Sequence, residues 1–133
     1  MKTERYFIIY KPVNMVSQFI STHQVKLLGD LNFDFPDGTH AIGRLDQHSE
    51  GLLLLTTNKK ITKLLFQGIK PHTRTYLVQV KNKVSKETAK HLSEGIEISA
   101  SGGGRYRTSP CLVKIVDKPN YITEPEIPLH PNA

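Results

Sequence analysis

The stretch GRLDQHSEGLLLLTTN, residues 43–58, decides how the rest of the chain is interpreted. It places a guanidinium, Arg44, two positions before a carboxylate, Asp46, in a short polar segment, and four consecutive leucines follow. A short, continuous apolar run is typical of a strand that is buried on both faces. Because a packed strand end holds its neighbours more rigidly than a free loop does, Asp46 is a candidate catalytic residue.

Asp46 and Arg44 also have a purely structural interpretation. In it, Asp46 caps a turn and Arg44 is its partner at the surface, since exposed ion pairs are common and contribute little to stability. The residues around the pair favour a function instead, because they form a longer and more specific pattern.

That pattern consists of Gly-Arg-Leu-Asp, three residues, Glu-Gly-Leu-Leu-Leu-Leu-Thr, one residue and Asn. It resembles the signature of the RsuA-type pseudouridine synthases. Residues 6–12 (YFIIYKP) are similar to the family's opening strand, and residues 74–80 (RTYLVQV) are similar to its strand with a basic residue and a Tyr. The resemblance implies that Asp46 is the nucleophile that isomerises a uridine in structured RNA.

Roles are also expected for three other residues, for Arg44 from its charge and for Tyr76 and Arg74 from the resemblance. Arg44, if it lies close to Asp46, would favour the ionised form of that carboxyl. Tyr76 would pack against the target base and take part in proton transfer, whereas the alternating pattern around it indicates, taken alone, a core aromatic. Arg74 occupies a position where the family often has Lys, and we expect it to contact RNA.

Two further pairs of basic residues are candidate RNA contacts. Lys59 and Lys60 stand where the family usually has Asp-Gly, and they either contact phosphate or belong to a solvated helix face. Arg105 and Arg107 flank an aromatic residue after three glycines. That combination suits phosphate contact and base stacking, and a plain hairpin tip is the alternative.

The composition agrees with a nucleic-acid partner. The 133 residues include 18 Lys and Arg against 12 Asp and Glu, a formal net charge of +6, and 38% are hydrophobic. An excess of positive charge favours a polyanion through counterion release, and the partner that the resemblance implies is ribosomal RNA. The six His and the single cysteine, Cys111, show no metal-ligand spacing, so we expect no metal and no cofactor. Cys111 is expected to be a small buried residue.

Apolar spacing and turn residues predict the secondary structure. Strands are expected at 6–10, 52–55, 75–81, 96–98 and 112–116, and helices at 21–28, 59–69 and 85–94. Asn58 and Ser85 are the expected caps of the second and third helices, and Gly95 is the expected end of the third. Phe33 and Phe35 either stack on bases or hold their loop against the core.

Together these elements and the resemblance indicate an α+β fold, with a mixed, mainly antiparallel sheet flanked by helices and a catalytic cleft at Asp46. We expect one catalytic domain, residues 1–133, whose segment 118–133 is irregular because of its prolines. The chain begins with the catalytic motifs, without the small RNA-binding domain of many relatives, and ends before the family's second basic segment. We therefore expect an incomplete domain of the branch that acts on large-subunit ribosomal RNA, inactive in multiple turnover by itself.

The predicted function is isomerisation of a specific uridine to pseudouridine in ribosomal RNA. With no apolar run long enough to span a membrane, we expect a cytoplasmic protein, and a monomer. A non-catalytic RNA-binding module of the same fold is the alternative, and it would show salt-dependent RNA affinity without isomerisation. A plain interaction domain, in which the positive charge is incidental, is a third interpretation.

Overall fold

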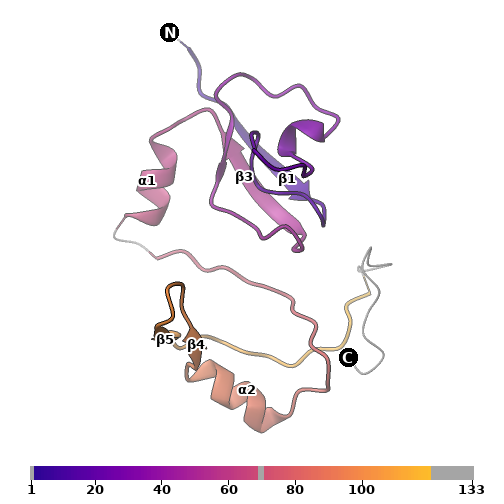
Figure 1. Ribbon diagram of the computed structural model, residues 1–133, viewed down its shortest axis with the longest axis vertical. Helices are drawn as coiled ribbons and strands as arrows, with labels where there is room; N and C mark the ends of the chain where they lie inside the picture. The colour runs from indigo at the N-terminus through magenta and orange to yellow at the C-terminus, as the bar shows by residue number, and fades with distance from the viewer. Residues whose placement is uncertain (1, 69–70, 121–133) are drawn as a thin grey trace. The chain divides into compact units, whose positions relative to one another are not determined.

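The computed structural model describes residues 2–68 and 71–120. The protein divides into two compact units, Met1–Thr75 and Tyr76–Ala133, and each is described by itself (Figure 1). Most of the segment 118–133 and the end of the predicted helix 59–69 lie outside the described residues. Within the described ranges, no helix is both long and apolar enough to cross a membrane.

A three-stranded sheet forms the centre of the first unit. Its strands are β1 (Tyr6–Lys11), β3 (Gly51–Thr56) and β2 (His40–Ile42), in that spatial order. Both outer strands run antiparallel to β3. The strands predicted at 6–10 and 52–55 are therefore confirmed, and the leucine run is the central strand of the sheet.

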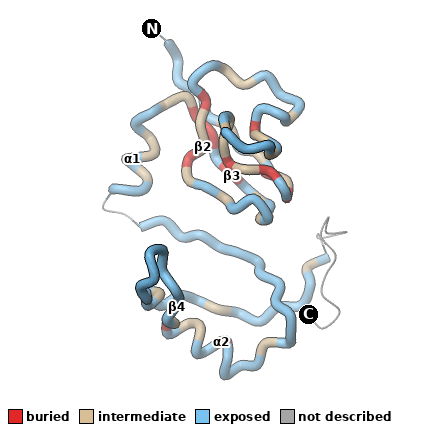
Figure 2. Tube along the Cα trace, viewed as in Figure 1, coloured by how far each residue is buried: buried red, intermediate tan, exposed pale blue. Residues whose placement is uncertain are grey.

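The buried residues of the first unit gather at this sheet and the segments next to it (Figure 2), and its core lies on one face of the sheet. The buried cluster consists of Met15, Leu28, Leu53 and Leu55. The other two leucines of β3 point to the opposite face, where Leu52 is 75% and Leu54 42% exposed. The prediction that the leucine run is buried on both faces is wrong, because successive side chains alternate between faces and an antiparallel sheet can leave one face open.

The segment between β1 and β2 is largely irregular. It contains a single 3-10 turn, η1 (Leu28–Asp30), so the helix predicted at 21–28 is wrong. The N–H of Leu28 donates to the C=O of Gln18 at 2.9 Å instead of to a carbonyl one helical turn earlier. Because the backbone of this segment bonds to residues outside it, the helical ladder does not form.

Phe33 and Phe35 hold the loop 30–39 against the sheet. Their rings meet that of Phe7 on β1 edge-on, with centroids 5.6 and 5.5 Å apart. Phe35 also meets Phe19 at 5.4 Å. Edge-to-face pairs at these separations are favourable. The structure thus agrees with the alternative in which the two rings hold the loop against the core.

Helix α1 (Ile61–Phe66) follows β3 through a turn at Asn58. The residue that flanks the helix is Lys60, which itself has helical dihedral angles, and the predicted cap, Asn58, lies two residues before it. The side-chain oxygen of Asn58 accepts the N–H of Lys60 at 3.0 Å, and its amide donates to the hydroxyl of Tyr6 at 2.9 Å. Asn58 therefore ties the start of α1 to strand β1.

The second unit consists of helix α2 (Lys86–Ser93) and an antiparallel hairpin of β4 (Glu97–Ser99) and β5 (Arg105–Arg107). The hydroxyl of Ser85 accepts the N–H of Thr88 at 3.1 Å, so the predicted cap is confirmed.

Gly95 ends helix α2, as predicted. Its φ is +94°, and a Cβ at this position would collide with the carbonyl oxygen of Thr108. Only glycine combines this conformation with so close an approach.

Three predictions about residues 75–116 are wrong. Residues 75–81 and 112–116 form no strand, and Cys111 is exposed. A strand requires a neighbour that exchanges backbone hydrogen bonds with it, and alternation in the sequence does not supply that neighbour. The α+β class is confirmed, since helices accompany two sheets whose ladders are antiparallel within the described residues.

Candidate active site

Asp46 lies in the loop that joins β2 to β3. Its side chain is exposed, and its backbone carbonyl oxygen accepts the N–H of Ser49 at 3.0 Å in a tight turn. The loop leaves β2 through Gly43 and enters the central strand at Gly51. The carboxylate is therefore carried by a short connection between two paired strands, with solvent on its open side.

The peptide before Asp46 is held by a buried serine. The hydroxyl of Ser17 donates to the C=O of Leu45 at 2.8 Å and accepts the N–H of the same residue at 3.0 Å. Ser17 is 28 residues away in sequence and is buried. No sequence motif marks this serine as part of the site.

The residue after Asp46 is held from the same segment. The N–H of Asn14 donates to the C=O of Gln47 at 2.7 Å, and the Lys11 ammonium lies 3.5 Å from the same oxygen. Asn14 has a φ of +63°, and its side-chain oxygen lies 3.2 Å from Nδ1 of His48. Residues 11–17 thus contact the loop on both sides of the candidate nucleophile.

Lys11 is a buried cation beneath this loop. The residue is 0% exposed, and Nζ donates to the carbonyl oxygens of Pro12 at 2.8 Å and Met15 at 2.7 Å. Burial lowers the pKa of Lys11, and the nearby carboxylates of Glu50 and Asp46 oppose that shift. Nothing in a Lys-Pro pair of the sequence indicates that the Lys11 ammonium turns inward.

Arg44 lies beside Gln18 instead of Asp46. With the Gln18 amide turned so that its oxygen faces the guanidinium, Arg44 donates a hydrogen bond to it. Within the described residues Arg44 and Asp46 form no ion pair. The electrostatic role expected for Arg44, which depends on its lying close to Asp46, therefore stays a prediction.

Arg74 stacks on the ring of Phe66, and this ring contacts the start of the loop that carries Asp46. Its guanidinium carbon lies 5.0 Å from the centroid of the Phe66 ring at the end of α1. The same ring covers Gly43, where a Cβ would lie 3.0 Å from the ring edge. Stacking of this kind is a favourable cation–π contact, and it places Arg74 next to the start of the loop that carries Asp46.

Gly43→Ala is expected to destabilise the first unit by about 1–2 kcal/mol, because the residue has a φ of +78° and the new methyl would press on Phe66. Urea unfolding would measure the loss. Gly104→Ala is the matched control, since a Cβ there meets nothing within 4 Å. Equal midpoints for the two variants would contradict the prediction.

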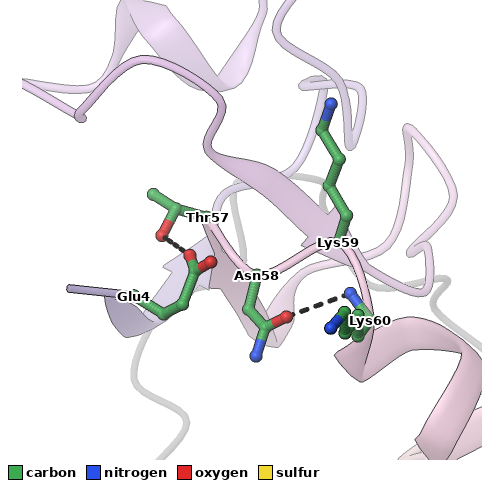
Figure 3. A pocket seen from close by; sticks show the side chains of 5 residues that line it. All are labelled: Glu4, Thr57, Asn58, Lys59 and Lys60. Carbon is green, nitrogen blue, oxygen red and sulfur yellow. Dashed lines mark hydrogen bonds between the residues drawn. The ribbon is translucent and has the colours of Figure 1, made fainter. Parts of the chain in front are cut away.

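Lys59 and Lys60 border an open hollow of about 390 Å³ at the start of α1 (Figure 3). Its other lining residues are Glu4, Thr57 and Asn58, and the Thr57 hydroxyl donates to the Glu4 carboxylate at 2.6 Å. Both lysines are exposed, and in the described part of the protein neither forms an ion pair. Their charges are available to an anion in solution.

The remaining predicted site residues belong to the second unit. Tyr76 is 60% exposed there, so its ring is not buried in a core. Arg105 and Arg107 alternate with Tyr106 along β5, so the guanidiniums share one face and the Tyr106 ring stands on the other. Arg105 lies 3.5 Å from Glu97, an exposed ion pair. The predicted hairpin tip at the glycines is confirmed.

No three His, Cys, Asp or Glu side chains of the described residues are grouped so as to hold a metal ion. What the first unit offers chemically is an exposed carboxylate on a loop whose backbone is held on both sides, with a buried ammonium below. A carboxylate of this kind can act as a nucleophile or a base.

The profile of the RNA pseudouridylate synthase family matches residues 5–126. The protein belongs to this family. A solved structure described as a pseudouridylate synthase superposes with a TM-score of 0.68 at 24% sequence identity, over 88% of this chain and 49% of that one. This likeness supports the α+β fold with its flanking helices.

Curated relatives agree with the family. The sequence is 29% identical to ribosomal large subunit pseudouridine synthase B of Bacillus subtilis, over 98% of this chain and 54% of the relative. It is 33% identical to ribosomal large subunit pseudouridine synthase E of Vibrio vulnificus, over 87% of this chain and 47% of the relative. The protein thus spans about half the length of these relatives.

Proposed function

We propose that this protein supplies the nucleophile of an enzyme that isomerises a uridine to pseudouridine in large-subunit ribosomal RNA. The observation that carries the proposal is the exposed Asp46 in a loop held on both sides by hydrogen bonds, in a sequence that matches the pseudouridylate synthase family. We further propose that the protein acts in the cytoplasm as a monomer and needs no cofactor.

Asp46 would begin the reaction as an ionised carboxylate. It either attacks the anomeric carbon or removes the 2′ proton of the ribose, and the C–N glycosidic bond breaks. The released uracil turns and is joined again through carbon, so that the product has the same atoms as the substrate.

The target base has to leave its stack before it can reach Asp46. Extrusion of a base costs a few kcal/mol, and protein groups must hold the distorted strand. In the first unit, Arg44, Arg74, Lys59 and Lys60 are the proposed phosphate contacts. In the second unit, we propose that Tyr76 packs against the base and that Arg105 and Arg107 contact the backbone.

Lys59→Ala and Lys60→Ala are each expected to weaken binding to a large-subunit ribosomal RNA transcript. Each lost phosphate contact lowers the slope of log K against log salt by about 0.7–0.9. Fluorescence anisotropy at several salt concentrations would measure the slope. Lys86→Ala, an exposed lysine on α2, is the control and keeps the wild-type slope. A slope that is unchanged in the first two variants would remove these lysines from the RNA contacts.

Mapping pseudouridines in ribosomal RNA from cells with and without the gene tests the function itself. Loss of one pseudouridine from large-subunit RNA is the expected result. Loss from small-subunit RNA would correct the proposed target. An unchanged map, with a protein that still binds ribosomal RNA, would favour the non-catalytic RNA-binding module.

A further inference from the structure

We propose that Ser17 is a positioning residue for the Asp46 carboxylate, an inference that rests on the proposed function. The Ser17 hydroxyl makes two hydrogen bonds to Leu45, one as donor to the C=O at 2.8 Å and one as acceptor from the N–H at 3.0 Å. A hydroxyl is well suited to this double contact, because it carries one donor and two acceptor sites.

The carbonyl that Ser17 binds belongs to the peptide group that joins Leu45 to Asp46. A peptide group is planar, so fixing its oxygen also fixes the direction of the bond from the Asp46 nitrogen to its Cα. The second bond fixes the preceding peptide group. Together they leave little freedom for the backbone that aims the carboxylate.

Ser17 is itself firmly held. It is buried, and the adjacent Val16 donates its N–H to the C=O of Lys26 at 3.0 Å. Met15, two residues earlier, belongs to the buried core cluster. Because this segment is rigid, its hydrogen bonds fix the position of the loop. Hydrogen bonds from a mobile side chain would not do so, because the loop could move together with that side chain.

Asp46 is held from its other side by a different residue. The N–H of Asn14 donates to the C=O of Gln47 at 2.7 Å, and this bond does not involve the Ser17 hydroxyl. Removing the hydroxyl therefore releases the loop before Asp46 and leaves it attached after Asp46. The expected consequence is a carboxylate that is present but misaimed, and misplacement of a reacting group by about 1 Å can slow a reaction about 100-fold.

Ser17→Ala tests the proposal by separating catalysis from binding. We expect single-turnover isomerisation of a large-subunit ribosomal RNA transcript to slow by about 10-fold to 100-fold, with Kd within about twofold of wild type. Ser17→Thr keeps the hydroxyl and is expected to recover most of the rate. Ser21→Ala is the control, since among the described residues that hydroxyl accepts a local N–H, from His23 at 3.1 Å, and the wild-type rate is expected.

Amide hydrogen exchange of the free protein gives a second readout that does not depend on activity. In Ser17→Ala the Leu45 N–H should exchange faster, while the Asn14 N–H should keep its wild-type protection. A wild-type protein that isomerises no ribosomal RNA would contradict the proposed function. The exchange rates would still decide whether Ser17 holds the loop.

Three results would overturn the proposal. The first is an unchanged Leu45 exchange rate in Ser17→Ala, which would mean that the hydroxyl does not hold the loop. The second is faster exchange with an unchanged isomerisation rate. The third is a loss of rate matched by an equal loss of RNA affinity, which a general structural defect would produce.

Discussion

Asp46→Asn is expected to abolish isomerisation while RNA binding stays near the wild-type level. Asparagine keeps the shape of the side chain but has no nucleophilic carboxylate, so the first step of the reaction is lost. Single-turnover assays on a ribosomal RNA transcript should give less than about a hundredth of the wild-type rate, with Kd unchanged. Because Asp46 is exposed, the substitution should leave the fold intact.

Asp34→Asn is the matched control for this experiment. It removes the same charge from another exposed carboxylate, in the loop that Phe33 and Phe35 hold against the sheet. The control should keep the wild-type rate. A rate above a hundredth of wild type in Asp46→Asn would exclude Asp46 as the nucleophile.

Lys11→Met is expected to have the largest effect on stability. The ammonium is fully buried and donates to the carbonyl oxygens of Pro12 and Met15. Methionine fills a similar volume but leaves these acceptors without their donor, at a cost of about 2–4 kcal/mol. Urea unfolding at pH 7 would measure the loss as a lower midpoint.

The pKa of Lys11 adds a pH dependence to this comparison. Burial lowers that pKa below its ordinary value of 10.5, so between the two pKa values the unfolded protein binds more protons than the folded one. The contribution of Lys11 to the free energy of unfolding therefore rises as pH increases toward 10.5. The reason is that a growing fraction of the folded protein carries Lys11 uncharged and so avoids the cost of burying a charge. The stability gap between wild type and Lys11→Met should widen over that range.

Lys26→Met separates the buried ammonium from a general change of charge. Lys26 is exposed, so its removal changes the net charge equally without opening a hydrogen-bonding site. Lys26→Met should unfold at a urea concentration close to the wild-type midpoint. The difference in stability between this variant and wild type should not widen as pH increases. Equal midpoints for Lys11→Met and Lys26→Met would contradict the structural role of Lys11.

Elements with complete local signals could be predicted from the sequence. Strands β1 and β3 are compact apolar runs, and α2 has both a serine that caps its start and a glycine that ends it. The hairpin at Arg105–Arg107 is marked by the glycines before it. In each case the residues that determine the element lie within or next to it.

Elements that depend on distant partners could not be predicted in this way. The sequence predicts a helix at 21–28, but the N–H of Leu28 bonds to the C=O of Gln18 and no α-helix forms there. Residues 75–81 alternate as a strand should, yet no strand is formed there. Propensity is a weak prior that tertiary hydrogen bonding overrides.

The sequence by itself determined the family and the position of the candidate nucleophile, because the pattern at 43–58 is contiguous and specific. Only the tertiary structure decided what holds Asp46 in place. Ser17 and Lys11 contact its loop from 28 and 36 residues away. Their hydrogen bonds go to backbone carbonyls, which every residue carries, so no side-chain pattern marks the residues that they bind.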